Sequence, residues 1–427
     1  SEPAEKEVAH TIFIAGGFGN QNGEESQEIK KLLSQKLRDA DSSSMLLYVG
    51  DNISEEVGAW QKDKFLIDEQ IQLTEGFKGE VVFLPGNNEW KSRHIDSIQR
   101  VEEYLDEVET QEDYVQPKNG CPMEYRVISD SLDILLIDSK WFISNWSRVK
   151  GINKKCTDIV TRMRFAEELE GYINDAQGKN LIITMHHPVF TNGENAGHKS
   201  FKSHMLPLPL VGTLLNGIYD LGAFSPENPL SRRYNYLRVL VTSLAKASNR
   251  VTVISGHEES LQYLSGGDIH QIVSGAMGRS KTTKQTTDEI NTVGGSLSYK
   301  GHFTHGKKGF AQLDYFTDGS SQVTFITADD APKTFNVLPA LESGTGDASY
   351  QKVVAETVVD SVYGPEENLE HTKFFKYLWG ERYRNYYHTA VTAPVVYLDT
   401  LYGGLEFMKK GGGHQSYSIR LQDQDQR

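Results

Sequence analysis

Short runs of apolar residues recur along the chain, and several of them are separated by segments in which apolar residues follow a helical spacing. The runs typical of buried strands lie at 11–15, 45–49, 81–84, 134–137, 181–184 and 251–254, and the helical segments lie at 27–37, 101–108 and 162–176. This alternation predicts a layered α/β domain, because each face of a buried sheet needs helices to cover it.

The pattern changes beyond the last of these strands. Segments 262–263, 269–274, 311–316 and 322–327 alternate more clearly and are separated by turn sequences, which predicts a run of antiparallel strands. Residues 278–301 are rich in Lys, Thr, Ser and Gly, and we interpret them as a surface loop. The pattern stops near Pro332. We therefore expect a main domain over 1–332, a connector over 333–370 and a C-terminal segment over 371–427.

The C-terminal segment 371–427 differs in composition from the rest of the chain. It is basic and places aromatic side chains close together, including Phe374, Tyr377 and Trp379. Such aromatic anchors are common both to a capping element laid on a domain and to a segment that docks on a partner or near a membrane. Both interpretations stay open at this point.

Charge and composition exclude some partners. The net charge of -14 over 427 residues opposes binding to a phosphate backbone, which requires many Lys and Arg contacts, so we expect no nucleic acid. No run of about 18 apolar residues occurs, so we expect no transmembrane helix. The cysteines, Cys121 and Cys156, are too few for a disulfide scaffold, and the sequence leaves open whether they pair.

Potential metal ligands follow four of the predicted strands. Asp51 comes after the run 45–49, Asn87 after 81–84, His186 after 181–184 and His257 after 251–254. Ligands of layered α/β folds bind at the carboxyl ends of strands, so these side chains are expected to meet. Each one alone is more often a turn, cap or loop residue. Together, carboxylate, amide and imidazole ligands suit Mn, Fe or Zn.

The order of these motifs resembles that of the calcineurin-like phosphoesterases with purple-acid-phosphatase-type motifs. Those proteins carry G-D-x-G, G-D-x-x-Y, G-N-H-D or G-N-H-E, H-x-P and G-H-x-H in this order, and the chain is similar over roughly residues 10–330. The resemblance implies an α/β fold, a four-layer metallophosphoesterase β-sandwich flanked by helices, with the C-terminal segment as an appendage. It also implies a two-metal site for phosphate ester hydrolysis.

Four positions depart from these motifs. Gly17 stands where the family has an Asp ligand, Ser54 where it has a Tyr, and Glu259 where it has the last His. These three changes fall on one metal. Asn88 stands where the family has a His that protonates the leaving group or stabilises the transferring phosphoryl group, and an amide cannot supply a proton.

The remaining ligands match the complete set of the other metal. The resemblance assigns to it Asp51, Asn87, His186 and His257, with Asp51 as the carboxylate that ordinarily bridges both metals. We therefore expect at most one metal ion, which would be Mn, Fe or Zn. The sequence offers no candidate for a catalytic side chain. Glu258 or Glu259 could still supply a carboxylate ligand.

Other histidines are expected to lie outside the site. His187 follows a buried strand and is predicted to point away from its neighbour, whereas His198 and His204 lie in a polar stretch. His302 and His305 are interpreted as loop residues near a Gly-rich turn.

Three functions remain for such a chain. The loss of one metal site favours the first, a non-catalytic scaffold or binding module. The alternative is a single-metal phosphoesterase acting on phosphate mono- or diesters, and the third is a small-ligand receptor that uses the old cleft. The stretch 386–400 and the glycines that follow it resemble a segment of Bacteroidota envelope proteins in which a phosphoesterase-like domain precedes an outer-membrane β-barrel. That resemblance implies a place in the cell envelope, associated with the outer membrane, with envelope proteins as partners of the C-terminal segment.

Overall fold

The computed structural model of the chain describes residues 6–19, 25–108, 114–193, 227, 229, 231–246, 248–281, 283, 291–293 and 297–341. The helices within them are α1 (Glu25–Asp39), α2 (Trp60–Leu73), α3 (Asp96–Val108), α4 (Ser139–Ile143), α5 (Arg162–Asp175) and α8 (Arg232–Ala245). Short 3-10 helices form at η1 (Asn88–Trp90), η2 (Lys118–Gly120) and η3 (Trp146–Arg148).

The first sheet has six strands in the order β14-β13-β12-β1-β2-β3. Its strands are β1 (Val8–Ala15), β2 (Ser44–Tyr48), β3 (Glu80–Phe83), β12 (Gly309–Phe316), β13 (Ser321–Thr327) and β14 (Lys333–Leu338). Strands β1, β2 and β3 run parallel, and β12, β13 and β14 add antiparallel neighbours on the other side of β1. The carboxyl ends of β1, β2 and β3 therefore lie at one edge of the sheet.

The second sheet has eight strands in the order β10-β11-β8-β9-β7-β6-β5-β4. Its strands are β4 (Met123–Ser129), β5 (Leu132–Ile137), β6 (Asn180–Met185), β7 (Val251–Ser255), β8 (Leu261–Gly266), β9 (Ile269–Ser274), β10 (Asn291–Val293) and β11 (Leu297–His305). Strands β5, β6, β7 and β9 run parallel. Every residue of β5, β6 and β7 is buried, as expected of parallel strands with both faces covered.

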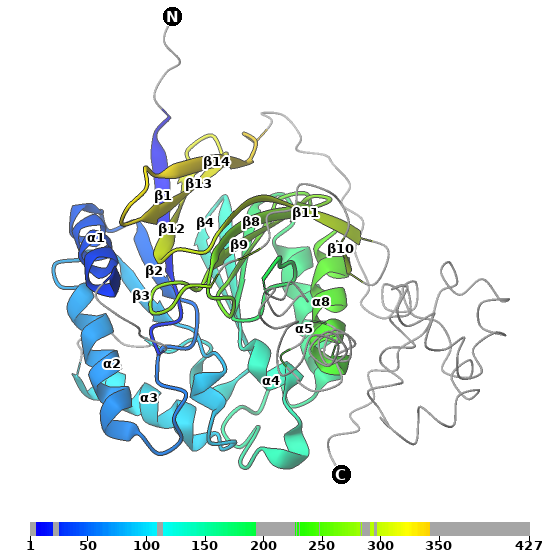
Figure 1. The fold of residues 1–427 in the computed structure, drawn as a ribbon. Coiled ribbons are helices and arrows are strands. Elements are labelled where there is room, and N and C mark those ends of the chain that lie inside the picture. The colour runs from blue at the N-terminus through cyan, green and yellow to red at the C-terminus, as the bar shows by residue number, and fades with distance from the viewer. Residues whose placement is uncertain are drawn as a thin grey trace, which may run out of the picture.

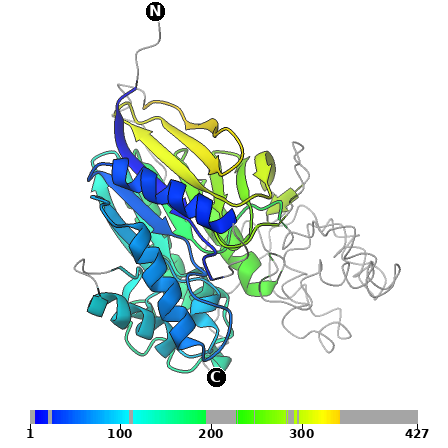
Figure 2. The ribbon, with the colours of Figure 1, turned by 60° about the vertical axis from the view of Figure 1, so that its left-hand side comes forward.

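The two sheets pack against each other, and helices cover their outer faces (Figures 1 and 2). Successive residues of a strand serve the two faces in turn: Ile12 and Ile14 belong to one buried cluster, and Phe13 and Ala15 belong to the other. Helices α1 and α2 lie over the first sheet, and α5 and α8 lie beyond the second (Figure 1). This arrangement is the predicted four-layer α/β sandwich.

Some of the predicted boundaries are wrong. Residues 333–338, expected to begin the connector, instead form the edge strand β14, so the first sheet extends past Pro332. The stretch 278–301, expected to be a loop, contains β10 and the start of β11. β14 pairs with the preceding strand β13 and β10 with the following strand β11, and β11 in turn pairs with β8, which is more distant in sequence. Residues 342–370 of the connector and the whole of 371–427 lie outside the described residues.

Cys121 and Cys156, whose pairing the sequence left open, form a disulfide with a Cα–Cα distance of 5.0 Å. Among the helices that the structure describes, none is long and apolar enough to cross a membrane.

Candidate metal centre

The predicted ligands follow the carboxyl ends of strands from both sheets. Asp51 follows β2 and Asn87 follows β3 in the first sheet, whereas His186 follows β6 and His257 follows β7 in the second. A hydrogen-bond contact of 2.8 Å between His186 Nδ1 and the carbonyl oxygen of Val49 joins the two sheet edges at this point. Sheet topology therefore brings four segments that are distant in sequence to one place.

The four predicted side chains lie close together. His186 Nε2 is 3.5 Å from Asp51 Oδ2, and Asn87 Nδ2 is 3.2 Å from His257 Nδ1. The rings of His186 and His257 have centroids 5.2 Å apart. Asp51 and His257 also adopt positive φ angles of 56° and 63°, which are uncommon for residues other than glycine. Strained backbone of this kind concentrates at functional sites.

Two buried atoms of this group lack a hydrogen-bond partner among the described residues. They are His186 Nε2 and Asn87 Oδ1. A buried polar atom left unpaired costs about 1–3 kcal/mol, so such atoms call for a ligand. Both are ligand types for Mn, Fe or Zn. Burial, helped by the neighbouring histidines, lowers the pKa of His257 well below its usual value, so this imidazole is neutral as a metal ligand must be. The residues present therefore fit one metal ion.

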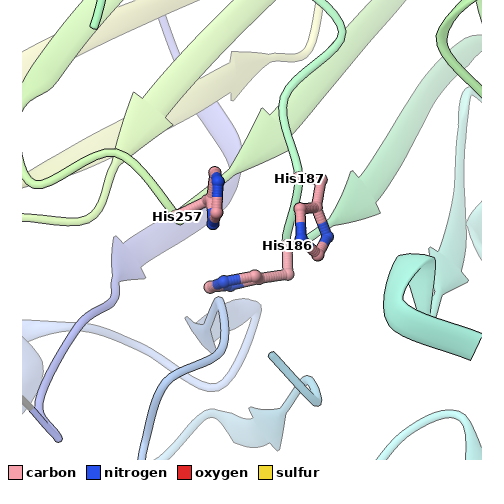
Figure 3. A group of neighbouring side chains, drawn as sticks. All are labelled: His186, His187 and His257. Carbon is pink, nitrogen blue, oxygen red and sulfur yellow. The ribbon is translucent and has the colours of Figure 1, made fainter. Parts of the chain in front are cut away.

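His187 lies beside these residues, contrary to the prediction that it points away. Ligand atoms of His186, His187 and His257 all lie within 4.8 Å of one another, and Figure 3 shows the three rings gathered past the ends of β6 and β7. The alternation of faces that supported the prediction holds only inside a strand, and β6 ends at Met185. The adjacent pair His186-His187 is the sequence signal that could have placed His187 in this group.

Both ring nitrogens of His187 already have partners. Nδ1 lies 2.8 Å from Ser139 Oγ, and Nε2 lies 2.7 Å from Glu227 Oε2. Burial lowers the pKa of His187 to about 4, although Glu227 opposes this shift. Burial would raise the pKa of Glu227, but the ion pair with Lys140 and the contact with His187 lower it well below its usual value. His187 is therefore a neutral ring held in place by Ser139 and Glu227.

The positions that depart from the motifs have other roles. Gly17 has a φ of +79°, and a Cβ atom added there would lie 2.5 Å from the carbonyl oxygen of Gly275. No side chain fits at this position with the present backbone. Glu259 forms ion pairs with Arg279 and, at 3.2 Å, with Lys281. Its carboxylate is therefore engaged by two cations.

The side chains at the other two departing positions, Ser54 and Asn88, also form hydrogen bonds within the protein. The Ser54 hydroxyl donates to Asp63 Oδ1 at 2.7 Å. The Asn88 side chain donates from Nδ2 to the carbonyl oxygen of Ile53 at 2.8 Å, and the Asn88 backbone amide donates to Asp51 Oδ1 at 2.9 Å. Asn88 thus stabilises the loop that carries Asp51.

The other candidate residues of the sequence do not join the group. Glu258 is buried and accepts from the hydroxyl of Thr191 at 3.1 Å. His302 and His305 lie on β11 rather than in a loop, where His302 Nε2 is 2.6 Å from Ser265 Oγ and His305 Nε2 is 3.0 Å from Asp330 Oδ2. His198 and His204 lie outside the described residues.

The sequence matches no protein-family model and no curated protein. Among solved structures, the chain is similar to GAP50, the anchor in the inner membrane complex of Plasmodium, with 13% identity, a TM-score of 0.50, and coverage of 82% of this chain and 94% of that one.

Two phosphatases are also among the similar structures. One is the purple acid phosphatase from yellow lupin seeds, with 14% identity, a TM-score of 0.45, and coverage of 78% of this chain and 54% of that one. The other is a dimetal phosphatase from Danio rerio, with 11% identity, a TM-score of 0.42, and coverage of 78% and 100%. The likeness at these identities is one of fold alone. The chain has the metallophosphoesterase-like sandwich fold, two mixed sheets flanked by helices.

Proposed function

We propose that this chain is a metallophosphoesterase-like protein that holds one metal ion and acts through protein contacts rather than by hydrolysis. The proposal is supported by what occupies positions 17 and 259, where the resemblance places ligands of the second metal. Gly17 has no room for a side chain, and Glu259 is engaged by Arg279 and Lys281. The residues that would have to bind a second ion serve the fold instead.

The chemistry left to a single ion is limited. A bound metal can polarise a phosphoryl oxygen and lower the pKa of a bound water, whereas a two-metal site clamps both the attacking and the leaving oxygen. Asn88, at the position of the family's acid, is directed to the carbonyl of Ile53. Positioned proton transfer contributes about 10² to 10⁴-fold to a rate, so its loss together with the loss of one metal leaves little turnover.

A second candidate is a slow single-metal phosphoesterase. It is favoured by the unpartnered His186 Nε2 and Asn87 Oδ1, because these atoms suit a metal whether or not the metal turns over a substrate. The two candidates differ in what the ion does. In the scaffold it stabilises the loops that carry its ligands, and in the enzyme it activates a phosphate ester.

We also propose a place in the bacterial envelope, in an outer-membrane assembly for protein biogenesis or transport. The disulfide between Cys121 and Cys156 supports an oxidising compartment. GAP50 is described as an anchor in a membrane complex, which is a precedent for the fold in such a role. The proposed contact surface, 371–427, lies outside the described residues.

The catalytic question is tested by metal analysis and turnover on the same preparation. The purified chain is incubated with Mn, Fe or Zn, its metal content is measured, and hydrolysis of an aryl phosphate monoester and diester is followed beside His257→Ala. We expect about one metal per chain and no turnover above that variant. Two metals with turnover that depends on His257 would overturn the proposal, and one metal with such turnover would favour the second candidate.

The partner question requires a separate experiment. The full chain and a chain ending at 341 are each used to capture proteins from detergent-solubilised outer membranes. We expect only the full chain to retain a defined set of outer-membrane proteins. Equal capture by both chains would remove the docking role of the C-terminal segment.

A further inference from the structure

A buried ammonium group lies against one of the lost ligand positions. Lys91 Nζ donates to the carbonyl oxygen of Ser54 at 2.7 Å and contacts Asp63 Oδ1 and Oδ2 at 2.9 and 2.7 Å. The side chains of Lys91 and Asp63 are only 9% and 5% exposed. Nothing in the motifs accounts for a buried ion pair here.

The pair also binds the rest of Ser54. Asp63 Oδ1 accepts from the Ser54 backbone amide at 3.0 Å and from its hydroxyl at 2.7 Å. The amide, hydroxyl and carbonyl of Ser54 are thus all bound by Lys91 or Asp63. The residue at the position of the family's Tyr ligand is held by a protein cation and its counterion.

The ion pair joins three segments of the site. Asp63 belongs to α2, and Ser54 lies in the loop between β2 and α2 that also carries Asp51. Lys91 follows η1, where its amide donates to the carbonyl of Asn88 at 3.2 Å. Asp51 and Asn87, which come from the first sheet, sit on the two loops connected in this way. Fixing these loops fixes the relative position of both ligands.

The buried carboxylate of Asp63 requires a cation beside it. Removing one member of a buried pair leaves an uncompensated charge, which typically costs about 3–5 kcal/mol, whereas replacing both by apolar groups can be neutral. In the two-metal site that the resemblance implies, the second ion would lie against positions 17, 54 and 259 and would supply positive charge there. Here Lys91 supplies a positive charge at Ser54, and Arg279 and Lys281 supply others at Glu259.

We propose that Lys91 and Asp63 are positioning residues for Asp51. In this proposal the Lys91 ammonium holds the loops that follow β2 and β3 together, in place of a second metal ion. The inference rests on the proposed loss of that ion. A single-metal centre then keeps its ligands in place without a second ion. Lys91 touches no substrate and supplies no ligand in this proposal.

The test uses three variants at the pair and one matched control. Lys91→Met leaves Asp63 unpaired, Lys91→Arg keeps the cation, and Lys91→Met/Asp63→Leu removes both charges while filling the volume. The control is Lys30→Met, which breaks a buried Lys30–Glu69 pair of 2.6 Å between α1 and α2. For each protein, the Kd for Zn²⁺ or Mn²⁺ is measured by competition with a chelator, and thermal unfolding is followed with and without metal.

We expect Lys91→Met and the double variant to bind the metal about 10-fold or more weakly, as is typical when a group that orients ligands is lost. Lys91→Arg should recover most of the affinity. Lys30→Met should lower thermal stability and leave the Kd unchanged. A double variant that folds and binds metal as tightly as the wild type would overturn the inference, as would a wild type that binds no metal. A wild type with two metals and turnover would instead overturn the proposed function.

Discussion

The carboxylate of Glu89 accepts a hydrogen bond from the backbone amide of Asn52 at 2.8 Å, so a side chain of η1 holds the loop that carries Asp51. The same carboxylate accepts from the amides of Asp51 at 3.2 Å and Gly86 at 2.6 Å. Glu89 is only 2% exposed. One buried carboxylate therefore organises the loops after β2 and β3, and in the first of them it binds the amides of Asn52 and Ile53, directly before the Ser54 that Lys91 contacts.

Replacing Glu89 by Gln should loosen both loops. A glutamine has one acceptor oxygen, and its amino group would face backbone N–H groups that already need acceptors. Leaving buried donors unpaired costs about 1–3 kcal/mol, so we expect a loss of that size in the free energy of unfolding by urea and weaker metal binding. Glu75→Gln, at an exposed position, is the control and should change neither quantity. Unchanged stability in Glu89→Gln would contradict this role.

Restoring the family's acidic ligand at position 17 should fail. Gly17→Asp puts a Cβ atom 2.5 Å from the carbonyl of Gly275, in addition to the cost of a positive φ. Gly58→Asp is a matched control, because Gly58 has a φ of +83° but nothing within 4 Å of an added Cβ. We expect Gly17→Asp to lose about 1–3 kcal/mol more than Gly58→Asp in urea unfolding, as overpacking typically costs. Metal analysis of the Gly17→Asp variant should show no second ion, and a gain of one would disprove the argument.

The parts of the site that the sequence predicted are those governed by strand ends. Buried runs place Asp51, Asn87, His186 and His257 at sheet edges, because parallel strands in layered folds end on the same side. The structure places all four together. Whether they bind a metal stays a prediction until metal content is measured.

The parts that were not predicted depend on contacts between distant residues. Lys91 and Asp63 are 28 positions apart and become a pair only when α2 packs beside η1. The hydrophobic pattern of α2 itself is weak, since this helix buries the polar residues Asp63 and Gln70. His187 was misplaced because its orientation is set by Ser139 and Glu227 rather than by the strand before it.

Breaking the disulfide should destabilise the main domain. Cys121 and Cys156 close a loop with a sequence separation of 35, and Cys156 is 2% exposed. In the chain-entropy model a loop of this length stabilises the fold by about 3–4 kcal/mol. We expect Cys121→Ser/Cys156→Ser to lose stability of that order in urea unfolding. Reductant should destabilise the wild type and leave the double variant unaffected, and a wild type indifferent to reductant would contradict the prediction.

The stability of the sheet region around His270 should depend on pH. His270 Nδ1 lies 2.9 Å from the hydroxyl of Tyr263, and burial, with a contribution from His302 and against that of Asp268, lowers the pKa of His270 to about 4. Between pH 6.5 and 4 the unfolded chain binds this proton and the folded chain does not. The stabilisation from a neutral His270 is therefore complete above pH 6.5 and falls as the pH drops toward 4.

Replacing His270 by Gln removes this titration while keeping a polar group near Tyr263. Between pH 8 and pH 4.5 the wild type should lose about 2 kcal/mol of unfolding free energy more than His270→Gln, after allowance for partial solvent screening. Urea unfolding of both proteins across this range measures the difference. At pH 8 the comparison gives the effect of the substitution alone, because the imidazole is neutral in both the folded and the unfolded chain. Parallel pH profiles for the two proteins would show that His270 gains its proton as readily in the fold as in the unfolded chain, which would contradict its burial against Tyr263.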